Sequence, residues 1–138
     1  METEVLFNSK NIDIAYDSEN RILYVNWKGY QTVDSVKAGC DKMLELLRKK
    51  SCNKMLNDNR LVTGPWQGAA EWVANNWFPR MYAAGLQHLA WIISPNAFSQ
   101  LSINQTLAAM NADPRTQTFG DHEVAKRWLI EAKKPQLV

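Results

Sequence analysis

The residue types from which catalytic and metal sites are most often built are scarce in this chain. Its 138 residues include two cysteines and two histidines. Cys40 and Cys52 form no CxxC pair and have no histidine near them, which argues against a zinc site and against a secreted disulfide framework. We expect reduced thiols, with Cys40 on an apolar helix face and Cys52 in an exposed loop. His88 and His122 lack a serine or cysteine partner at a motif spacing, so no nucleophile and base are recognisable.

The chain also has no large excess of positive or negative charge and no long apolar run. The 16 basic and 14 acidic residues give a net charge of +2 and are scattered along the chain, which does not indicate nucleic-acid binding. No apolar run approaches the roughly 18 residues needed to span a bilayer, and no signal peptide is recognisable. We therefore expect an unprocessed cytoplasmic protein without membrane insertion.

Tryptophan is the one residue type present in excess. A chain of this length fits one domain, residues 1–138, and can bury roughly two-thirds of its unfolded surface. Large aromatic side chains are most often buried, so we expect most of the tryptophans in the core. The six are Trp27, Trp66, Trp72, Trp77, Trp91 and Trp128.

The first half of the chain predicts a β-hairpin followed by a helix. Apolar residues alternate over residues 12–16, a second β-rich run covers residues 22–27, and a four-residue polar turn separates them. Thr32 is a suitable N-cap for a helix whose apolar residues recur three and four apart. Three basic residues at 48–50 suit the negative end of that helix.

The second half predicts alternating strands and helices. Residues 55–57 are expected to form a short strand, and Gly64 and Pro65 to start a helix that Pro79 ends or bends near Phe78. A short helix is then expected over 79–84, stopped by Gly85, followed by a mid-sheet strand over 89–93. After these come a helix over 97–110 and a strand over 117–119. A last helix is expected to be capped by Asp121, with Val124, Ala125, Trp128 and Leu129 facing inward. The expected class is α/β: a single domain with a mixed four- to five-stranded sheet and about four helices, in the order ββαβαβαβα.

The predicted third strand ends in four consecutive polar residues, Asn57, Asp58, Asn59 and Arg60. The end of such a strand faces the ligand crevice in many α/β folds. Arg60 could bind a carboxylate or phosphate there. The interpretation we favour is that Asp58 and Asn59 bond loop amides while Arg60 pairs with a nearby carboxylate.

The order of elements and several short markers resemble the SpoIIAA-like branch of the STAS superfamily. The markers are Asp58-Asn59-Arg60, Asn76-Trp77-Phe78-Pro79-Arg80 leading to Ala84-Gly85-Leu86, and Phe119-Gly120-Asp121 before Ala125-Lys126-Arg127-Trp128-Leu129. The resemblance covers about residues 12–129. It implies a small mixed sheet with helices mainly against one face, and a bacterial interaction module rather than an enzyme.

Regulatory members of that superfamily carry a phosphorylatable serine in an Asp-Ser-(Ser/Thr)-Gly turn. The corresponding residues here are Leu61, Val62, Thr63 and Gly64, so only the hydroxyl and glycine pair remains. Phosphorylation of Thr63 would place about −2 charge at a helix N-terminus. We favour the simpler interpretation that Thr63 and Gly64 start a helix.

The aromatic residues between Trp66 and Tyr82 leave three interpretations open. Trp72 falls off the apolar stripe that contains Trp66 and Trp77, so it could anchor a protein interface. The same segment could instead cover a ligand cavity, or simply pack on both sides under neighbouring loops.

The sequence therefore predicts a non-catalytic interaction or regulatory module, with a carrier or sensor of a small apolar or anionic ligand under the Trp66 to Tyr82 helices as the alternative. A carrier needs a cavity of roughly 300 Å³ or more. We expect no cofactor and no metal, and a partner that is another protein or a second copy of this chain in a homodimer. The candidate interaction or ligand residues are Asp58, Arg60, Thr63, Trp66, Trp72 and Arg80.

Overall fold

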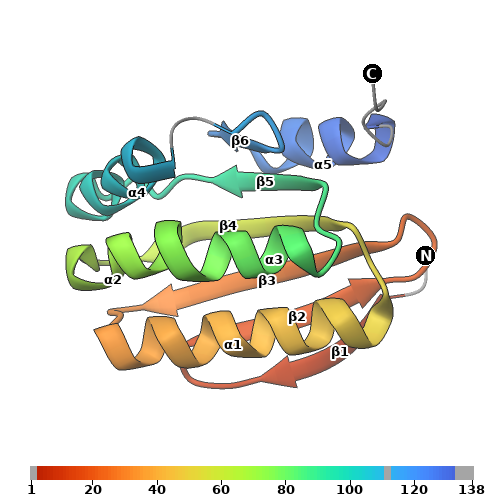
Figure 1. The fold of residues 1–138 in the computed structure, drawn as a ribbon, viewed down its shortest axis with the longest axis horizontal. Helices are drawn as coiled ribbons and strands as arrows, with labels where there is room; N and C mark the ends of the chain where they lie inside the picture. Colours follow the sequence, from red (N-terminus) through yellow and green to blue (C-terminus); the bar gives the residue numbers. More distant parts are fainter. Residues whose placement is uncertain (1–2, 111–112, 133–138) are drawn as a thin grey trace.

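One mixed sheet organises the fold, and its strands lie side by side in the order in which they occur in the chain (Figure 1). A computed structural model describes residues 3–110 and 113–132. The first three strands are antiparallel to one another, whereas the pairs from the third to the sixth strand are parallel. The strands are β1 (Thr3–Asn8), β2 (Ile12–Asp17), β3 (Ile22–Gly29), β4 (Lys54–Val62), β5 (His88–Ile92) and β6 (Thr116–Phe119).

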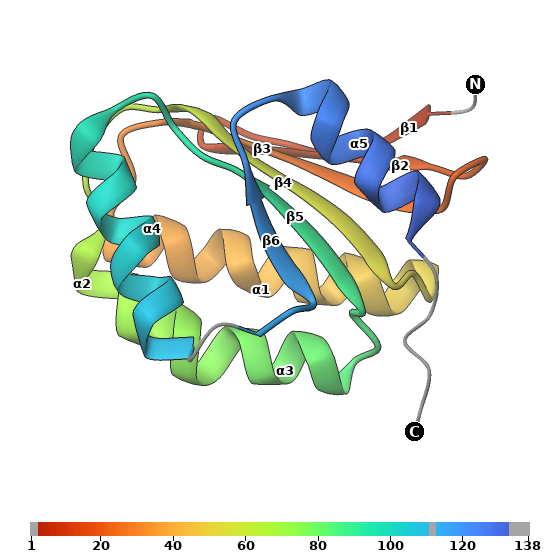
Figure 2. The same cartoon turned by 90° about the horizontal axis from the view of Figure 1, so that it is seen from above.

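The helices divide unequally between the two faces of the sheet (Figure 2). On the inner face, as we call it, lie the helices that connect the parallel strands, with α4 packed against α2 and η1. The last helix lies alone on the opposite face, the α5 face, over β4, β5 and β6. The helical segments are α1 (Val33–Lys50), α2 (Gln67–Trp72), η1 (Val73–Trp77), α3 (Phe78–Ala83), α4 (Ala97–Met110) and α5 (His122–Glu131).

The capping signals read from the sequence are used as expected in α1 and α5. The Thr32 hydroxyl accepts a hydrogen bond from the Ser35 amide at 3.0 Å, and the Ser35 hydroxyl accepts one from the Thr32 amide at 2.8 Å, which forms a capping box. Asp121 caps α5 by accepting from the Glu123 amide at 3.0 Å. Gly85 follows α3 with a φ of +114°, a conformation that suits glycine and ends the helix.

Helices α2, η1 and α3 follow one another without a break, so the expected interruption near Phe78 is a π turn rather than an end. The Phe78 amide donates to the Val73 carbonyl five residues back, which is the π pattern. Pro79, which has no amide to donate, lies directly after this π turn in the first turn of α3. The expected helix start at Gly64 and Pro65 is wrong, since α2 begins at Gln67 and has no side-chain cap.

The inner face carries the larger core. Alternate residues of β2, β3, β4 and β5 point into it and meet the apolar sides of α1, α2, η1 and α3. A smaller core on the α5 face contains the other alternate residues of β3, β4 and β5 together with Ala125 and Leu129 of α5. The helices therefore do pack mainly against one face.

Other expectations about single elements are wrong. The sheet has six strands rather than four or five, because β1 also pairs with β2. The pairing shifts register between Val5 and Phe7, and this irregularity hides the alternation of β1 in the sequence. Strand β4 runs on to Val62 instead of ending at Asn57. Cys52 is buried rather than exposed, and Val124 is half exposed on the solvent side of α5 rather than facing inward.

Candidate functional site

The polar residues of β4 lie inside the strand and alternate between its two faces. Asn57 and Asn59 belong to the inner face, where both line a cavity among tryptophans. Asp58 belongs to the α5 face, where it lines a groove that also includes His122. Strand alternation separates what looked like one polar cluster in the sequence into two distinct sites.

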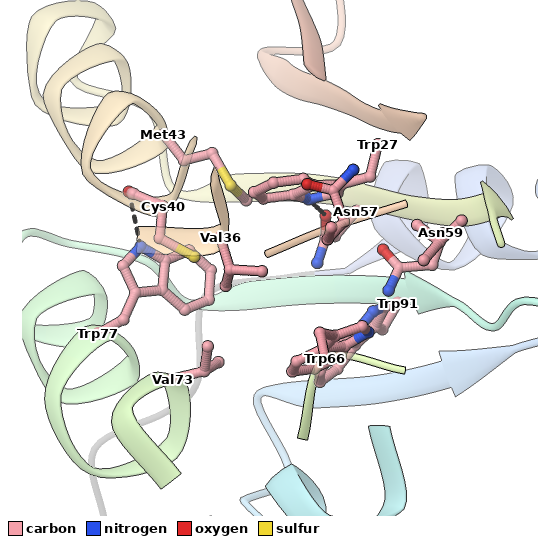
Figure 3. Close-up of a pocket in the computed structure, with 12 residues that line it drawn as sticks. Trp27, Val36, Cys40, Met43, Asn57, Asn59, Trp66, Val73, Trp77 and Trp91 are labelled. Carbon is pink, nitrogen blue, oxygen red and sulfur yellow. Dashed lines mark hydrogen bonds between the residues drawn. The ribbon is translucent and has the colours of Figure 1, made fainter. Parts of the chain in front are cut away.

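The inner-face site, which we call the tryptophan cavity, is small and lies between β3, β4 and β5 and the helices of the inner face (Figure 3). Its volume is about 30 Å³, roughly a tenth of what a small organic ligand needs. All of its lining residues are buried. They are Trp27, Gln31, Val36, Cys40, Met43, Asn57, Asn59, Val62, Trp66, Val73, Trp77 and Trp91.

Hydrogen bonds satisfy some of the polar atoms around the tryptophan cavity and leave others without a partner. The Trp27 indole donates to Asn57 Oδ1 at 2.9 Å, and the Trp77 indole donates to the Cys40 carbonyl at 2.8 Å (Figure 3). In contrast, Trp91 Nε1 and Asn59 Oδ1 are buried and have no partner in the protein. Buried polar atoms of this kind are rare in folded proteins and call for an explanation.

The second site is a groove of about 250 Å³ on the part of the α5 face that α5 leaves uncovered. We call it the α5-side groove. The strand register places Asp13 of β2, Asn26 of β3 and Asp58 of β4 next to one another in one row across its floor. The rings of Tyr24 and His122 stack at one side, with centroids 6.2 Å apart and an interplanar angle of 12°.

Both carboxylates of the α5-side groove are already paired with cations. Lys28 Nζ lies 2.8 Å from Asp13 Oδ2, and Arg60 Nη2 lies 2.7 Å from Asp58 Oδ2. Burial, with smaller contributions from nearby carboxylates, raises the pKa of the Tyr24 hydroxyl to about 12, so that group stays protonated. Tyr24 Oη and Asp13 Oδ1 are buried without a partner in the protein.

A third feature is the carboxyl edge, the end of the sheet where the parallel strands finish and the helices begin. Five of the eight exposed large apolar side chains among the described residues lie on the loops, strand ends and helix starts of this edge. The Tyr30 ring lies close to Gly64, and Val33 lies close to Gly68, so the segments after β3 and β4 are in contact here. The five are Tyr30, Val33, Leu61, Phe98 and Leu101.

Two of the candidate residues from the sequence, Asp58 and Arg60, form a local pair. Arg60 donates to the Asp58 carboxylate through both Nε and Nη2, and its backbone amide donates to the same group at 3.0 Å. This is the carboxylate pairing that we favoured for Arg60, although its partner is the residue two positions before it. The pair lies on the α5 face, and the Arg60 side chain is about half exposed.

Thr63 and Trp66, which are also candidates, lie apart from that pair. Thr63 is exposed in the loop after β4, four residues before α2 begins, so its hydroxyl is not at a helix N-terminus. Its backbone accepts a hydrogen bond from the Asn96 amide side chain at 3.2 Å. Trp66 is buried on the inner face and stacks on Trp91 with ring centroids 6.1 Å apart, so it is a core residue.

The last two candidates, Trp72 and Arg80, meet between α1 and the helices that follow β4. The Trp72 ring is half-buried, with the Lys37 ammonium 5.6 Å and the Arg80 guanidinium 5.7 Å from its centroid. Arg80 also bonds Asp41 at 3.2 Å. These contacts use the faces of the Trp72 ring within the protein itself.

Neither the cysteines nor the histidines form a reactive cluster. Burial raises the pKa of both the Cys40 and the Cys52 thiols, which keeps them protonated. Burial and the nearby Lys54 lower the pKa of His88, whose ring packs edge-on against Trp128. Within residues 3–110 and 113–132, no three or more His, Cys, Asp and Glu side chains come together in a way that could hold a metal ion.

Sequence reasoning missed the residues that matter most in the two polar sites. Trp91 lies within an apolar run, and nothing in the run shows that its indole would lack a partner. Asp13, Tyr24 and Asn26 occupy the alternate positions of the hairpin opposite its apolar residues, a pattern that could have indicated a polar sheet face.

No family model, curated protein or solved structure matches this chain. Among the described residues, no helix has the length and apolar character needed to cross a bilayer.

Proposed function

We propose that this chain is a non-catalytic STAS-like module that binds another protein through its carboxyl edge. The observation that carries the proposal is the concentration of exposed apolar side chains there. Tyr30 and Phe98 are 64% and 62% exposed, and three more large apolar residues lie on the same edge. Soluble monomers seldom gather apolar residues in this way unless the surface has a partner.

The charges near this edge favour an apolar partner surface over an anionic ligand. Two cations near it, Lys28 and Arg60, are already paired with Asp13 and Asp58, while Lys10 lines a groove with Tyr30. The aromatic and branched side chains would therefore supply most of the binding energy, as is usual for the centre of a protein interface.

The internal volume supports an interaction module over a carrier. The tryptophan cavity of about 30 Å³ lies under the Trp66 to Tyr82 helices, the place where a carrier would hold its ligand. A ligand of even ten heavy atoms needs several times that volume. An interaction module needs no cavity.

Site-specific photocrosslinking in the native host tests the proposal. A photoreactive phenylalanine analogue at position 98 or 61 should capture one dominant protein, whereas the same analogue at Val124, which is also exposed but lies on α5, should not. Phe98→Ser should then weaken the affinity for the purified partner at least tenfold, because aromatic anchors typically contribute more than 1.4 kcal/mol.

The outcomes of this experiment separate the alternatives. Capture of a second copy of this chain would make the edge a homodimer contact. Equal capture from positions 98 and 124, or an unchanged affinity of Phe98→Ser, would contradict the proposal.

A second candidate function is supported by the α5-side groove. Tyr24 and Asp13 line a volume of about 250 Å³, close to the lower limit for small ligands, and Tyr24 Oη and Asp13 Oδ1 are buried without a partner in the protein. A compact ligand with a hydroxyl group would accept a hydrogen bond from the Tyr24 hydroxyl and donate one to Asp13 Oδ1. Native mass spectrometry of protein from its own host should then show a bound small molecule that Tyr24→Phe loses and Tyr30→Phe keeps.

A further inference from the structure

We propose that the tryptophan cavity is a binding site for one internal water molecule, which bridges Trp91 Nε1 and Asn59 Oδ1. The two atoms belong to neighbouring strands on the same face of the sheet. Trp91 of β5 pairs in register with Asn57 of β4, and Asn59 is the next residue of β4 on that face. Both side chains are more than nine-tenths buried, and neither of the two atoms has a partner in the protein.

The size of the cavity selects water over larger ligands. A cavity needs about 10–15 Å³ to hold one water molecule. The tryptophan cavity, at about 30 Å³, is large enough for one water and too small for an organic ligand. Empty cavities in proteins are apolar, whereas this one has the amide groups of Asn57 and Asn59 in its wall (Figure 3), together with that of Gln31.

The two unpartnered atoms also select a neutral ligand that both donates and accepts. The Trp91 indole is only a donor, and Asn59 Oδ1 is only an acceptor. A metal cation would satisfy Asn59 but leave the indole N–H without an acceptor, and a halide would do the reverse. Water accepts from Trp91 and donates to Asn59 at the same time.

The neighbouring indoles show why Trp91 needs such a ligand. Trp27 and Trp77 line the same cavity, and each donates to a protein acceptor, Asn57 Oδ1 and the Cys40 carbonyl. Their N–H groups are satisfied within the fold. Among these three, Trp91 alone would carry the cost of an unmade hydrogen bond if the cavity were empty.

A crystal structure of the full chain at about 1.5 Å resolution tests the proposal. We expect an isolated density peak within about 2.7–3.2 Å of both Trp91 Nε1 and Asn59 Oδ1. An empty cavity, or a direct hydrogen bond between the two side chains, would overturn the proposal.

A double-mutant cycle provides a second measurement. If one water links the two residues, Trp91→Phe and Asn59→Leu each leave one polar atom unsatisfied, and the double variant leaves neither. The double variant should therefore be more stable than the sum of the single effects predicts, by at least about threefold in the unfolding equilibrium constant. Additive effects would overturn the proposal. The control cycle pairs Trp91→Phe with Trp128→Phe on the α5 face and should be additive.

Discussion

Replacing Gly39 by alanine should destabilise this protein, although the same change inside most helices is stabilising. Gly39 lies in the interior of α1 and faces the indole of Trp27 in β3. A Cβ atom at this position would clash with Trp27 Cη2 and lie 2.7 Å from Cζ3, well inside normal contact distance. The indole cannot easily move away, because it is 6% exposed and its N–H is bonded to Asn57.

Two opposing contributions set the magnitude. Alanine gains about 1 kcal/mol over glycine in a helix interior. Forcing an extra carbon into a packed core costs about 1–3 kcal/mol, and the short contacts with an anchored ring place this site in the upper part of that range. The net expectation is a loss of about 1–2 kcal/mol in the free energy of unfolding, or a fall in Tm of roughly 3–8 °C.

Urea unfolding followed by far-UV circular dichroism measures this loss. Gly68→Ala in α2 is the matched control, because the added Cβ would meet only the end of the half-exposed Val33 side chain, so this variant should be neutral or slightly more stable. In a Trp27→Phe background, which lacks the clashing ring atoms, Gly39→Ala should no longer destabilise. A Gly39→Ala variant as stable as the parent protein would refute the reasoning.

Two further predictions concern buried polar groups. Asn57→Leu removes the acceptor of the buried Trp27 indole, so the free energy of unfolding measured in urea should fall by about 1–3 kcal/mol. Adding Trp27→Phe should restore part of this loss. An Asn57→Leu variant with unchanged stability would contradict this. Burial alone would raise the pKa of Asp17, but hydrogen bonds from Asn20 and Glu19 outweigh it and hold the pKa below the usual 3.8. The carboxylate therefore stabilises the fold above about pH 4, and this contribution is lost as the pH falls through its lowered pKa. Asp17→Asn should be less stable than the parent at pH 6, with a smaller difference at pH 2.5; an equal difference at both pH values would argue against this assignment.

The elements that the sequence predicted well are those with strong local signals. The hairpin of β2 and β3 has clear alternation around a polar turn, and α1 has both an N-cap at Thr32 and a basic last turn. Helix α4 matches its predicted bounds, residues 97–110. In each case, neighbours in the sequence determine the structure.

The elements that were missed depend on partners distant in the chain. β1 has a register shift that interrupts its alternation. It forms a strand because its backbone pairs with the free edge of β2. The polar residues of β4 resemble a loop in the sequence, yet they continue the strand because β3 and β5 pair with Asn57 and Asp58 on either side, and β3 pairs again with Leu61 and Val62.

The candidate site shows the same limit. The sequence identified the polar run of β4, but which face each residue occupies follows from the strand continuing through it. Trp66 was a candidate interaction or ligand residue and is in the core, where it stacks on Trp91, 25 residues away in the next strand. The sequence had no signal for the exposed apolar edge, since its members come from three separate segments of the chain.

The strand order also determines how the sheet can assemble during synthesis and where it can be extended. Each strand pairs with the strand before it, so no strand is inserted between two that are already paired. The strands can therefore pair in the order in which they are synthesised, each adding to the free edge of the strand before it. One more strand and helix could be appended beyond β6 without breaking any existing pair, which makes that edge the natural place to extend the fold by design.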